Sequence, residues 1–177
     1  DMPLTLFEYA KFSNNCDYSN FYIGSQALVI VTQIKTGGSF NFSYSFFNTK
    51  AVVIDFKATV ACKNLTSAFS SSSSLKYIMG TIQINSISEI DNAFNGCNEL
   101  LYFKMIGLAK DLYLGDSPKL QPETMLFLIK SSIKPTDKES FTITVHQDVF
   151  DKINNDSNWA SVKTSLTEKT YIKIAAK

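Results

Sequence analysis

The fold of this chain is decided by the stretch IDNAFNGCNELLYFKM, at positions 90–105. It holds a phenylalanine, a small residue three positions later and then a short hydrophobic run, here Phe94, Cys97 and the run that starts at Leu100. The same order occurs three more times upstream. The four phenylalanines are Phe21, Phe46, Phe69 and Phe94, at spacings of 25, 23 and 25. Four copies of one pattern at a nearly constant interval indicate an internal repeat.

Each phenylalanine is followed after five or six residues by a short hydrophobic run. The runs occupy residues 27–32, 51–56, 75–80 and 100–105, so their first residues are 24, 24 and 25 apart. A period near 25 lies within the range of leucine-rich repeats. Because one unit of this length cannot bury its own apolar face, the copies must stack on one another. The repetition predicts a solenoid in which each unit supplies one short parallel strand and the phenylalanines form an interior column.

Two further columns agree with this alignment. The small residues that follow the phenylalanines are Gly24, Thr49, Ser72 and Cys97. Four residues before the phenylalanine stands an apolar residue in three copies, Phe42, Leu65 or Ile90, whereas the first copy has Asp17 there. We read Cys97 as a packed thiol, and we read the serines at 70–74 as a tight corner of the repeat. Positions 1, 4 and 6 of each run are expected to point inward, and positions 3 and 5 outward.

After Met105 the pattern changes. Strands are expected at 111–114, 140–145 and 171–174, the second from its clean alternation. A helix is expected from Pro122 until Pro135 stops it, with its apolar face formed by Met125, Leu126, Ile129 and Ile133. Two more helices are expected at about 147–155 and 159–168, the latter capped by Ser157 or Asn158. This alternation is typical of a more helical repeat followed by an end cap.

The predicted class is therefore α/β, a leucine-rich-repeat solenoid of short parallel strands with a more helical C-terminal cap. The whole chain, 1–177, forms a single domain in this interpretation. Residues 1–17 are a divergent N-terminal segment, either a worn repeat or a cap. Residues 18–106 hold four repeats of about 25 residues, and residues 107–177 hold the helical repeat and the cap.

Two of the copies resemble a known family. The runs LTSAF at 65–69 and IDNAFNGCNEL at 90–100 look like the signature AF-x-x-C-x-x-L of BspA-type leucine-rich repeat proteins. The tail from Gly107 to the end is similar to C-terminal regions of that family, and the resemblance covers about residues 40 to 177. The chain departs from the family because no copy has the Leu-Pro dipeptide after its strand. The resemblance implies a bacterial protein, secreted or anchored at the cell surface, that contacts other molecules through a repeat scaffold.

Composition excludes several other classes. Seventeen lysines and arginines against sixteen acidic residues leave a net charge of +1, which gives no footprint for nucleic acid. The apolar stretch at 18–34 carries too many polar residues for a transmembrane segment. The single histidine, His146, follows an expected strand and precedes a helix, where it can cap the helix. Asp148 and Asp151 fit the positive end of that helix better than an acid/base pair.

Three cysteines without a CxxC pair indicate neither a zinc site nor a disulfide framework. A single bridge between Cys16 and Cys62 is left open. We expect no metal, no cofactor and no enzymatic activity, because no other motif supplies a catalytic set.

Outward strand positions are the candidate binding surface. Position 3 holds Val29, Val53, Tyr77 and Tyr102, so the two tyrosines should be neighbours on adjacent strands. The candidate binding residues are Tyr77, Tyr102, Lys104, Asp55, Met79 and Tyr113. Tyrosine supplies contact area at low entropic cost, which suits protein recognition or stacking on sugars. The alternative is that the paired rings only stabilise the sheet.

The leading hypothesis is a non-enzymatic adhesion or recognition module, a monomer, that binds a protein or extracellular-matrix partner through the strand face. The first alternative is a carbohydrate-binding module of a surface glycan-uptake system. The second is a structural spacer within a larger surface protein.

Overall fold

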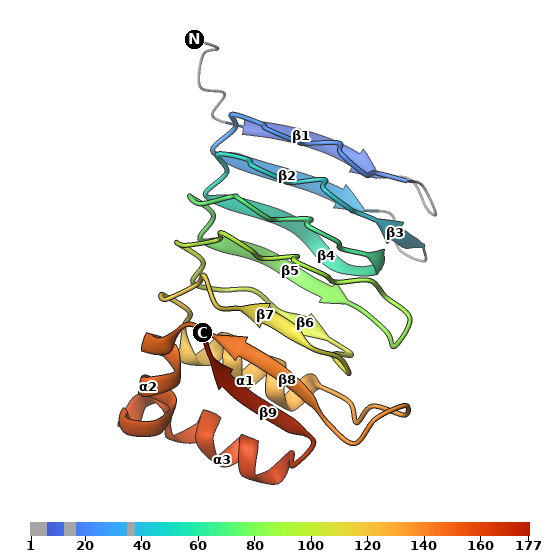
Figure 1. Ribbon diagram of the computed structural model, residues 1–177. Coiled ribbons are helices and arrows are strands. Elements are labelled where there is room, and N and C mark those ends of the chain that lie inside the picture. The colour runs from blue at the N-terminus through green and yellow to red at the C-terminus, as the bar shows by residue number, and fades with distance from the viewer. Residues whose placement is uncertain (1–6, 13–16, 35–37) are drawn as a thin grey trace.

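The computed structural model describes residues 7–12, 17–34 and 38–177 and shows a mixed α/β protein with two parallel sheets (Figure 1). The first sheet contains β1 Phe7–Phe12, β2 Val29–Ile34, β3 Ser39–Asn41, β4 Val53–Asn64, β5 Tyr77–Gln83 and β6 Met105–Ile106. The second contains β7 Leu112–Leu114, β8 Phe141–Val145 and β9 Ile172–Ala176. The helices are α1 Pro122–Ser131, α2 Gln147–Asn155, the short 3-10 helix η1 Ser157–Trp159 and α3 Ala160–Glu168.

The hydrophobic runs lie side by side in the predicted register. Val29 pairs with Val53, and Val53 pairs with Tyr77. An isolated parallel bridge then joins Tyr77 to Tyr102. The fourth run forms less regular strand than expected, because only this bridge and the two residues of β6 are paired. Before the first run, β1 adds one more strand in the same register, with Phe7 opposite Val29.

Between strands the chain returns along the opposite side of each turn. These return segments, residues 18–24, 42–48, 65–71 and 90–96, are joined by backbone hydrogen bonds from each segment to the next. The Phe46 amide donates to the Ala68 carbonyl at 2.8 Å, and the Phe69 amide donates to the Ala93 carbonyl at 2.9 Å. The segments therefore stack as the strands do, which Figure 1 shows as successive turns of the chain.

Left-handed residues bend each return segment at two places. The first bend is at Asn20, Tyr44, Ser67 and Asn92, and the second is at Gly24, Asn48, Ser71 and Gly96, all with positive φ. Most of these are glycine, asparagine or serine, short residues of which glycine and asparagine tolerate this conformation best. The serines at 70–74 thus belong to a turn of the stack, and Ser72 is fully buried within it. They are not a linker.

An aromatic column fills the interior, as predicted, although its first member is different. Phe46, Phe69 and Phe94 stack with ring centroids 5.4 Å apart at each step and planes inclined by 8° and 15°. The column continues to Phe103 at 4.6 Å and, at the other end, to Tyr22 at 5.4 Å from Phe46. The prediction for Phe21 was wrong, since its side chain is 55% exposed.

The error is a shift of one residue in the first copy. If Tyr22 is the ring of the first copy, the apolar position four residues before it is held by Tyr18, and not by Asp17. Tyr18 indeed stacks on Phe42, the residue at this position in the next copy, with ring centroids 6.2 Å apart. The same shift places Ser25, rather than Gly24, in the small-residue column. Thr49 makes the equivalent contact in the next copy, since both hydroxyls accept a hydrogen bond from the backbone two residues later. The first two turns have one residue fewer between the ring and the strand than the last two.

The expected inward positions are mostly buried. Position 1, held by Ala27, Ala51, Leu75 and Leu100, has no exposed surface in any copy. Position 4 is buried equally well, while positions 3 and 5 face outward except for the buried Val31. The strands also run further than the six-residue runs, because a bulge at Lys57 lets β4 continue to Asn64. Gly80 in β5 permits the close contact with this part of β4, since a Cβ there would lie 2.5 Å from the Ala58 carbonyl oxygen.

In the C-terminal part, a helix lies where the next strand would be. The backbone of Gln121 donates to Leu101 at 3.0 Å, and Gly107 donates to Ser131 at 3.3 Å, so α1 lies along residues 101–107 and covers that edge of the first sheet. In Figure 1, β8 and β9 run opposite to the strands of the first sheet. In this sheet Leu112 pairs with Ile143, and Phe141 pairs with Ile172. Paired residues are therefore further apart in sequence than in the first sheet, because helices lie between the strands.

The predicted elements of this part are largely confirmed. Helix α2 has the expected bounds, and β8 and β9 lie within two residues of theirs. Helix α1 ends at Ser131, earlier than expected, so Ile133 lies beyond it and is 49% exposed. The expected cap of the last helix was wrong, because the N-cap of α3 is Trp159, without a side-chain hydrogen bond, and not Ser157 or Asn158. The side-chain cap lies earlier, where Asp156 accepts from the Asn158 amide at 2.9 Å and caps η1.

We expect Phe69→Ala to lower the free energy of unfolding by about 3–5 kcal/mol, because this ring is fully buried between two stacked neighbours. Phe21→Ala serves as the matched control and should cost less than about 1 kcal/mol, since that ring is mostly exposed. Urea unfolding followed by circular dichroism measures both. Equal losses in the two variants would contradict the assignment of Tyr22 to the column.

Candidate functional site

The outward side of the strands carries the candidate residues, and we call it the strand face. It consists of Asp55, Tyr77, Met79, Tyr102 and Lys104. Tyr77 and Tyr102 are bridged neighbours and both are half-buried. Met79 pairs in register with Asp55 and is 41% exposed. Five of the six predicted residues therefore lie on one face, at the positions that the repeat assigns to them.

Lys104 links this face to α1. Its ammonium nitrogen Nζ lies 5.9 Å from the centroid of the Tyr102 ring and 5.5 Å from that of Phe127. A lysine at these distances from two rings is held by cation–π attraction. The side chain is thus placed before any ligand arrives, and it presents a positive charge between two aromatic surfaces.

Phe127 is a member of the site that the sequence analysis missed. It follows Tyr102 at the same interval at which Tyr102 follows Tyr77, so the period of the repeat could have identified it. The change from strand to helix hid this relation. The first repeat that has a helix instead of a strand still places its aromatic side chain next to the strand face, because α1 occupies that edge of the sheet.

A shallow hollow of about 450 Å³ lies along the outer side of α1, next to the strand face. Its lining residues are Glu123, Leu126, Phe127, Lys130 and Ser131. The hollow offers apolar contact from Leu126 and Phe127 and one charge of each sign at its margin. Aromatic rings, an aliphatic side chain and flanking charges form a surface suited to non-covalent recognition.

The carboxylate of Asp55 has a local partner. It forms an ion pair of 2.6 Å with Lys57 and accepts a hydrogen bond of 2.9 Å from the backbone N–H of the same residue. Lys57 has a positive φ and forms the bulge in β4. Asp55 therefore stabilises the bulge, and its charge is largely neutralised on the strand face.

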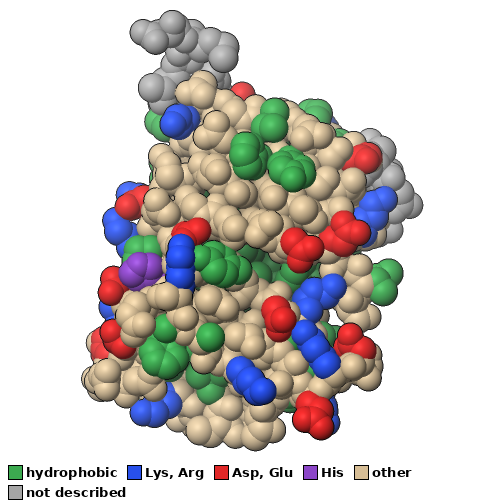
Figure 2. Space-filling view, viewed as in Figure 1, with side chains coloured by type: hydrophobic (Ala, Val, Ile, Leu, Met, Phe, Trp, Pro, Cys, Tyr) green, Lys and Arg blue, Asp and Glu red, His purple; other side chains and the backbone are tan. Residues whose placement is uncertain are grey.

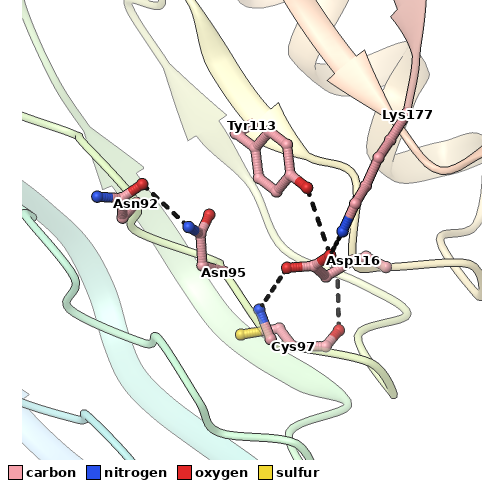
Figure 3. A network of polar contacts seen from close by, with 8 residues as sticks. Asn92, Asn95, Cys97, Tyr113, Asp116 and Lys177 are labelled. Atoms are coloured by element: carbon pink, nitrogen blue, oxygen red, sulfur yellow. Dashed lines mark hydrogen bonds and ion pairs between the residues drawn. The ribbon is translucent and has the colours of Figure 1, made fainter.

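Tyr113 does not join the other candidates. It lies in the second sheet, where its hydroxyl donates to Asp116 Oδ1 at 3.4 Å and the Lys177 ammonium lies 5.6 Å from its ring centroid (Figure 3). Asp116 also pairs with Lys177 and accepts from the Gly96 backbone at 2.9 Å. Burial alone would raise the pKa of Asp116, but these hydrogen bonds outweigh it and hold the pKa below its usual value. This cluster joins the C-terminal strand to the return segments.

His146 is the N-cap of α2, as expected. Its Nδ1 accepts a hydrogen bond of 3.2 Å from the backbone of Asp148, whose carboxylate lies 3.6 Å from the same nitrogen. A nitrogen that accepts this bond is occupied by the helix terminus. Asp148 lies in the first turn of α2, and Gln147 donates to Asp151, which agrees with the structural interpretation of both carboxylates.

Cys62 and Cys97 are buried free thiols. Cys97 donates to the Phe69 carbonyl at 3.1 Å, as Ser72 donates to Phe46 one repeat earlier, which confirms it as a packed member of the small-residue column. Burial raises the pKa of Cys97 to about 12 and raises that of Cys62 as well. The proposed partner of Cys62, Cys16, lies outside the described residues, and the structure gives Cys62 as unbridged.

Within residues 7–12, 17–34 and 38–177, no three histidine, cysteine, aspartate or glutamate side chains gather closely enough to hold a metal ion. In the same part of the chain, no helix has the length and apolarity needed to cross a bilayer. Comparisons with protein-family models, with curated proteins and with solved structures found no match.

We expect Cys62 and Cys97 to resist alkylation by iodoacetamide in the folded protein at about pH 9, because burial keeps both thiols protonated there while a thiol in the unfolded chain ionises near 8.5. The same difference makes the folded state less stable as pH rises above about 8.5, since the unfolded chain then releases protons that the folded chain retains. Peptide mass spectrometry measures modification at each site.

The control is the same reaction in guanidinium chloride, where both sites should be modified. Rapid alkylation of Cys97 in the folded protein would contradict its role as a packed thiol and would identify an accessible nucleophile instead.

Proposed function

We propose that this chain is a non-enzymatic recognition module of the leucine-rich-repeat class, similar to BspA-type surface proteins. The strands and return segments form a solenoid of stacked turns in this proposal, closed at one end by the helices. It is an extracellular or cell-surface protein of a bacterium, it acts as a monomer, and it binds a protein or matrix partner through the strand face. The in-register strands and the repeating hydrogen bonds support the solenoid.

The observation that carries the binding proposal is the row formed by Tyr77, Tyr102 and Phe127 with Lys104 held between the last two rings. Interfaces are enriched in aromatic side chains, and a few such residues supply most of the binding energy. Phe127 also lines the hollow along α1, so the contact surface extends from the strands to the helix.

A protein partner fits this surface better than a glycan for two reasons. Met79 and Leu126 add apolar, adaptable contact area that offers no hydrogen bond to sugar hydroxyls. Lys104, Lys130 and Glu123 provide charges that pair with charged side chains of a partner. Carbohydrate binding and a spacer function are the alternatives that the following experiment separates.

We expect the double substitution Tyr77→Ala and Tyr102→Ala to weaken capture of the chain on immobilised collagen, laminin or fibronectin by about tenfold or more, since hot-spot aromatic residues carry losses of this size. Surface plasmon resonance against each protein, in parallel with a glycan array, gives the readout. The double variant Tyr77→Phe and Tyr102→Phe keeps the rings and should retain most of the binding.

Phe21→Ala is the matched control, because it removes an exposed ring from a return segment and should leave capture unchanged. Retention on glycans that depends on the two tyrosines would favour a carbohydrate-binding module. The absence of both kinds of binding in the unmodified chain would favour a spacer.

A further inference from the structure

A second hollow of about 450 Å³ lies at the corner where the chain turns after β5, β6 and α1. We call it the corner groove, and its main lining residues are Ile87, Lys110, Ile133, Lys134, Thr136 and Lys138. We propose that the corner groove binds an acidic peptide segment that carries an aliphatic side chain. Its three loops turn at one edge of the stack in Figure 1, and charged side chains of both signs gather along that edge in Figure 2.

Hydrogen bonds hold the three loops together before any ligand binds. Lys110 Nζ donates to the Ser88 carbonyl at 2.5 Å, which joins the loops after β5 and β6. The backbone of Ile133 donates to Leu108 at 2.9 Å, which joins the loop after α1 to them. Because the walls are preorganised, little ordering entropy opposes binding in the groove.

The far wall is fixed in a similar way. Asp111 Oδ1 accepts from the backbone of Thr142 at 2.7 Å and forms an ion pair of 3.3 Å with Lys138. These contacts attach the loop between α1 and β8 to the start of β7. The groove is therefore a built feature of three connected loops, and its volume falls in the range of ligand sites.

Two exposed isoleucines supply the apolar part of the groove. Ile87 is 82% exposed, and Ile133 is 49% exposed. The loop holds Ile87 in this position, because its backbone donates to the Asn85 side chain at 3.1 Å. An aliphatic side chain of a partner that covered these two residues would remove their surface from water, which is favourable.

Lysines supply the charge. Lys110, Lys134 and Lys138 line the groove, opposed by one lining carboxylate, Asp137. Lys138 is paired with Asp111, whereas neither Lys110 nor Lys134 has a carboxylate within ion-pair distance among the described residues. The groove therefore has two positive charges to offer to a carboxylate of a ligand.

A sulfated sugar would use the lysines but would gain little from the isoleucines, because sugar hydroxyls need hydrogen-bond partners. A peptide with alternating acidic and aliphatic residues uses both parts of the groove at once. The combination of Ile87 with Lys134 is what favours the peptide.

The test uses a fluorescein-labelled hexapeptide of alternating aspartate and leucine, titrated with the full chain and followed by fluorescence polarisation. We expect Ile87→Ser and Lys134→Gln each to weaken binding by about tenfold. Higher salt should weaken it further, because part of the attraction is between exposed charges. Both substitutions are at exposed loop positions, so the fold should be retained, which circular dichroism checks.

Lys50→Gln is the matched control, since it removes an exposed lysine that precedes β4, at the opposite end of the strands from the loops of the groove, and should leave binding unchanged. Replacing aspartate by asparagine or leucine by serine in the peptide should each reduce binding. The double variant Tyr77→Ala and Tyr102→Ala should bind the peptide as well as the unmodified chain does. Binding in the corner groove is thereby distinguished from binding at the strand face.

Three results would overturn the proposal. The first is no measurable binding of the hexapeptide. The second is equal binding by the unmodified chain, Ile87→Ser and Lys134→Gln. The third is binding of a heparin oligosaccharide that Lys134→Gln abolishes and Ile87→Ser leaves unchanged, with weaker binding of the peptide, which would identify an anionic glycan site.

Discussion

The hydrogen bond of 2.8 Å from the Phe46 amide to the Ala68 carbonyl belongs to a set that joins each return segment to the next. Since each return segment pairs with a copy of itself one repeat away, the strands opposite are brought into register and the rings between them stack. The column from Tyr22 to Phe103 then fills the space that the two sides enclose. Burial of each ring contributes about 1.5–3 kcal/mol, and these contributions add along the stack.

This constraint also determines what lies on the outside. A period set by backbone pairing places the same position of every copy on the same line, which is why Tyr77, Tyr102 and Phe127 form one row although the last lies on a helix. The corners of the turns form the other kind of surface, where loops of different length create a hollow. Under the proposals above, the row and the corner groove are independent contact surfaces on one scaffold.

The period, the parallel strands and the buried column could be predicted because they depend on residue types that recur at fixed spacing. The first copy was misaligned by one residue because Phe21 and Tyr22 are both aromatic, and spacing alone cannot separate them. Tyr113 was placed with the wrong neighbours because the direction of the strands reverses in the second sheet. The corner groove could not be predicted, since its walls come from three loops without a shared motif.

The most direct test of the stacked turns is nuclear magnetic resonance measurement of scalar couplings across hydrogen bonds. If the turns are stacked, couplings are expected from the amide nitrogens of Phe46 and Phe69 to the carbonyl carbons of Ala68 and Ala93, respectively, in each case one repeat away. Couplings from these amides to carbonyls within about ten residues, as in antiparallel hairpins, would contradict this stacking.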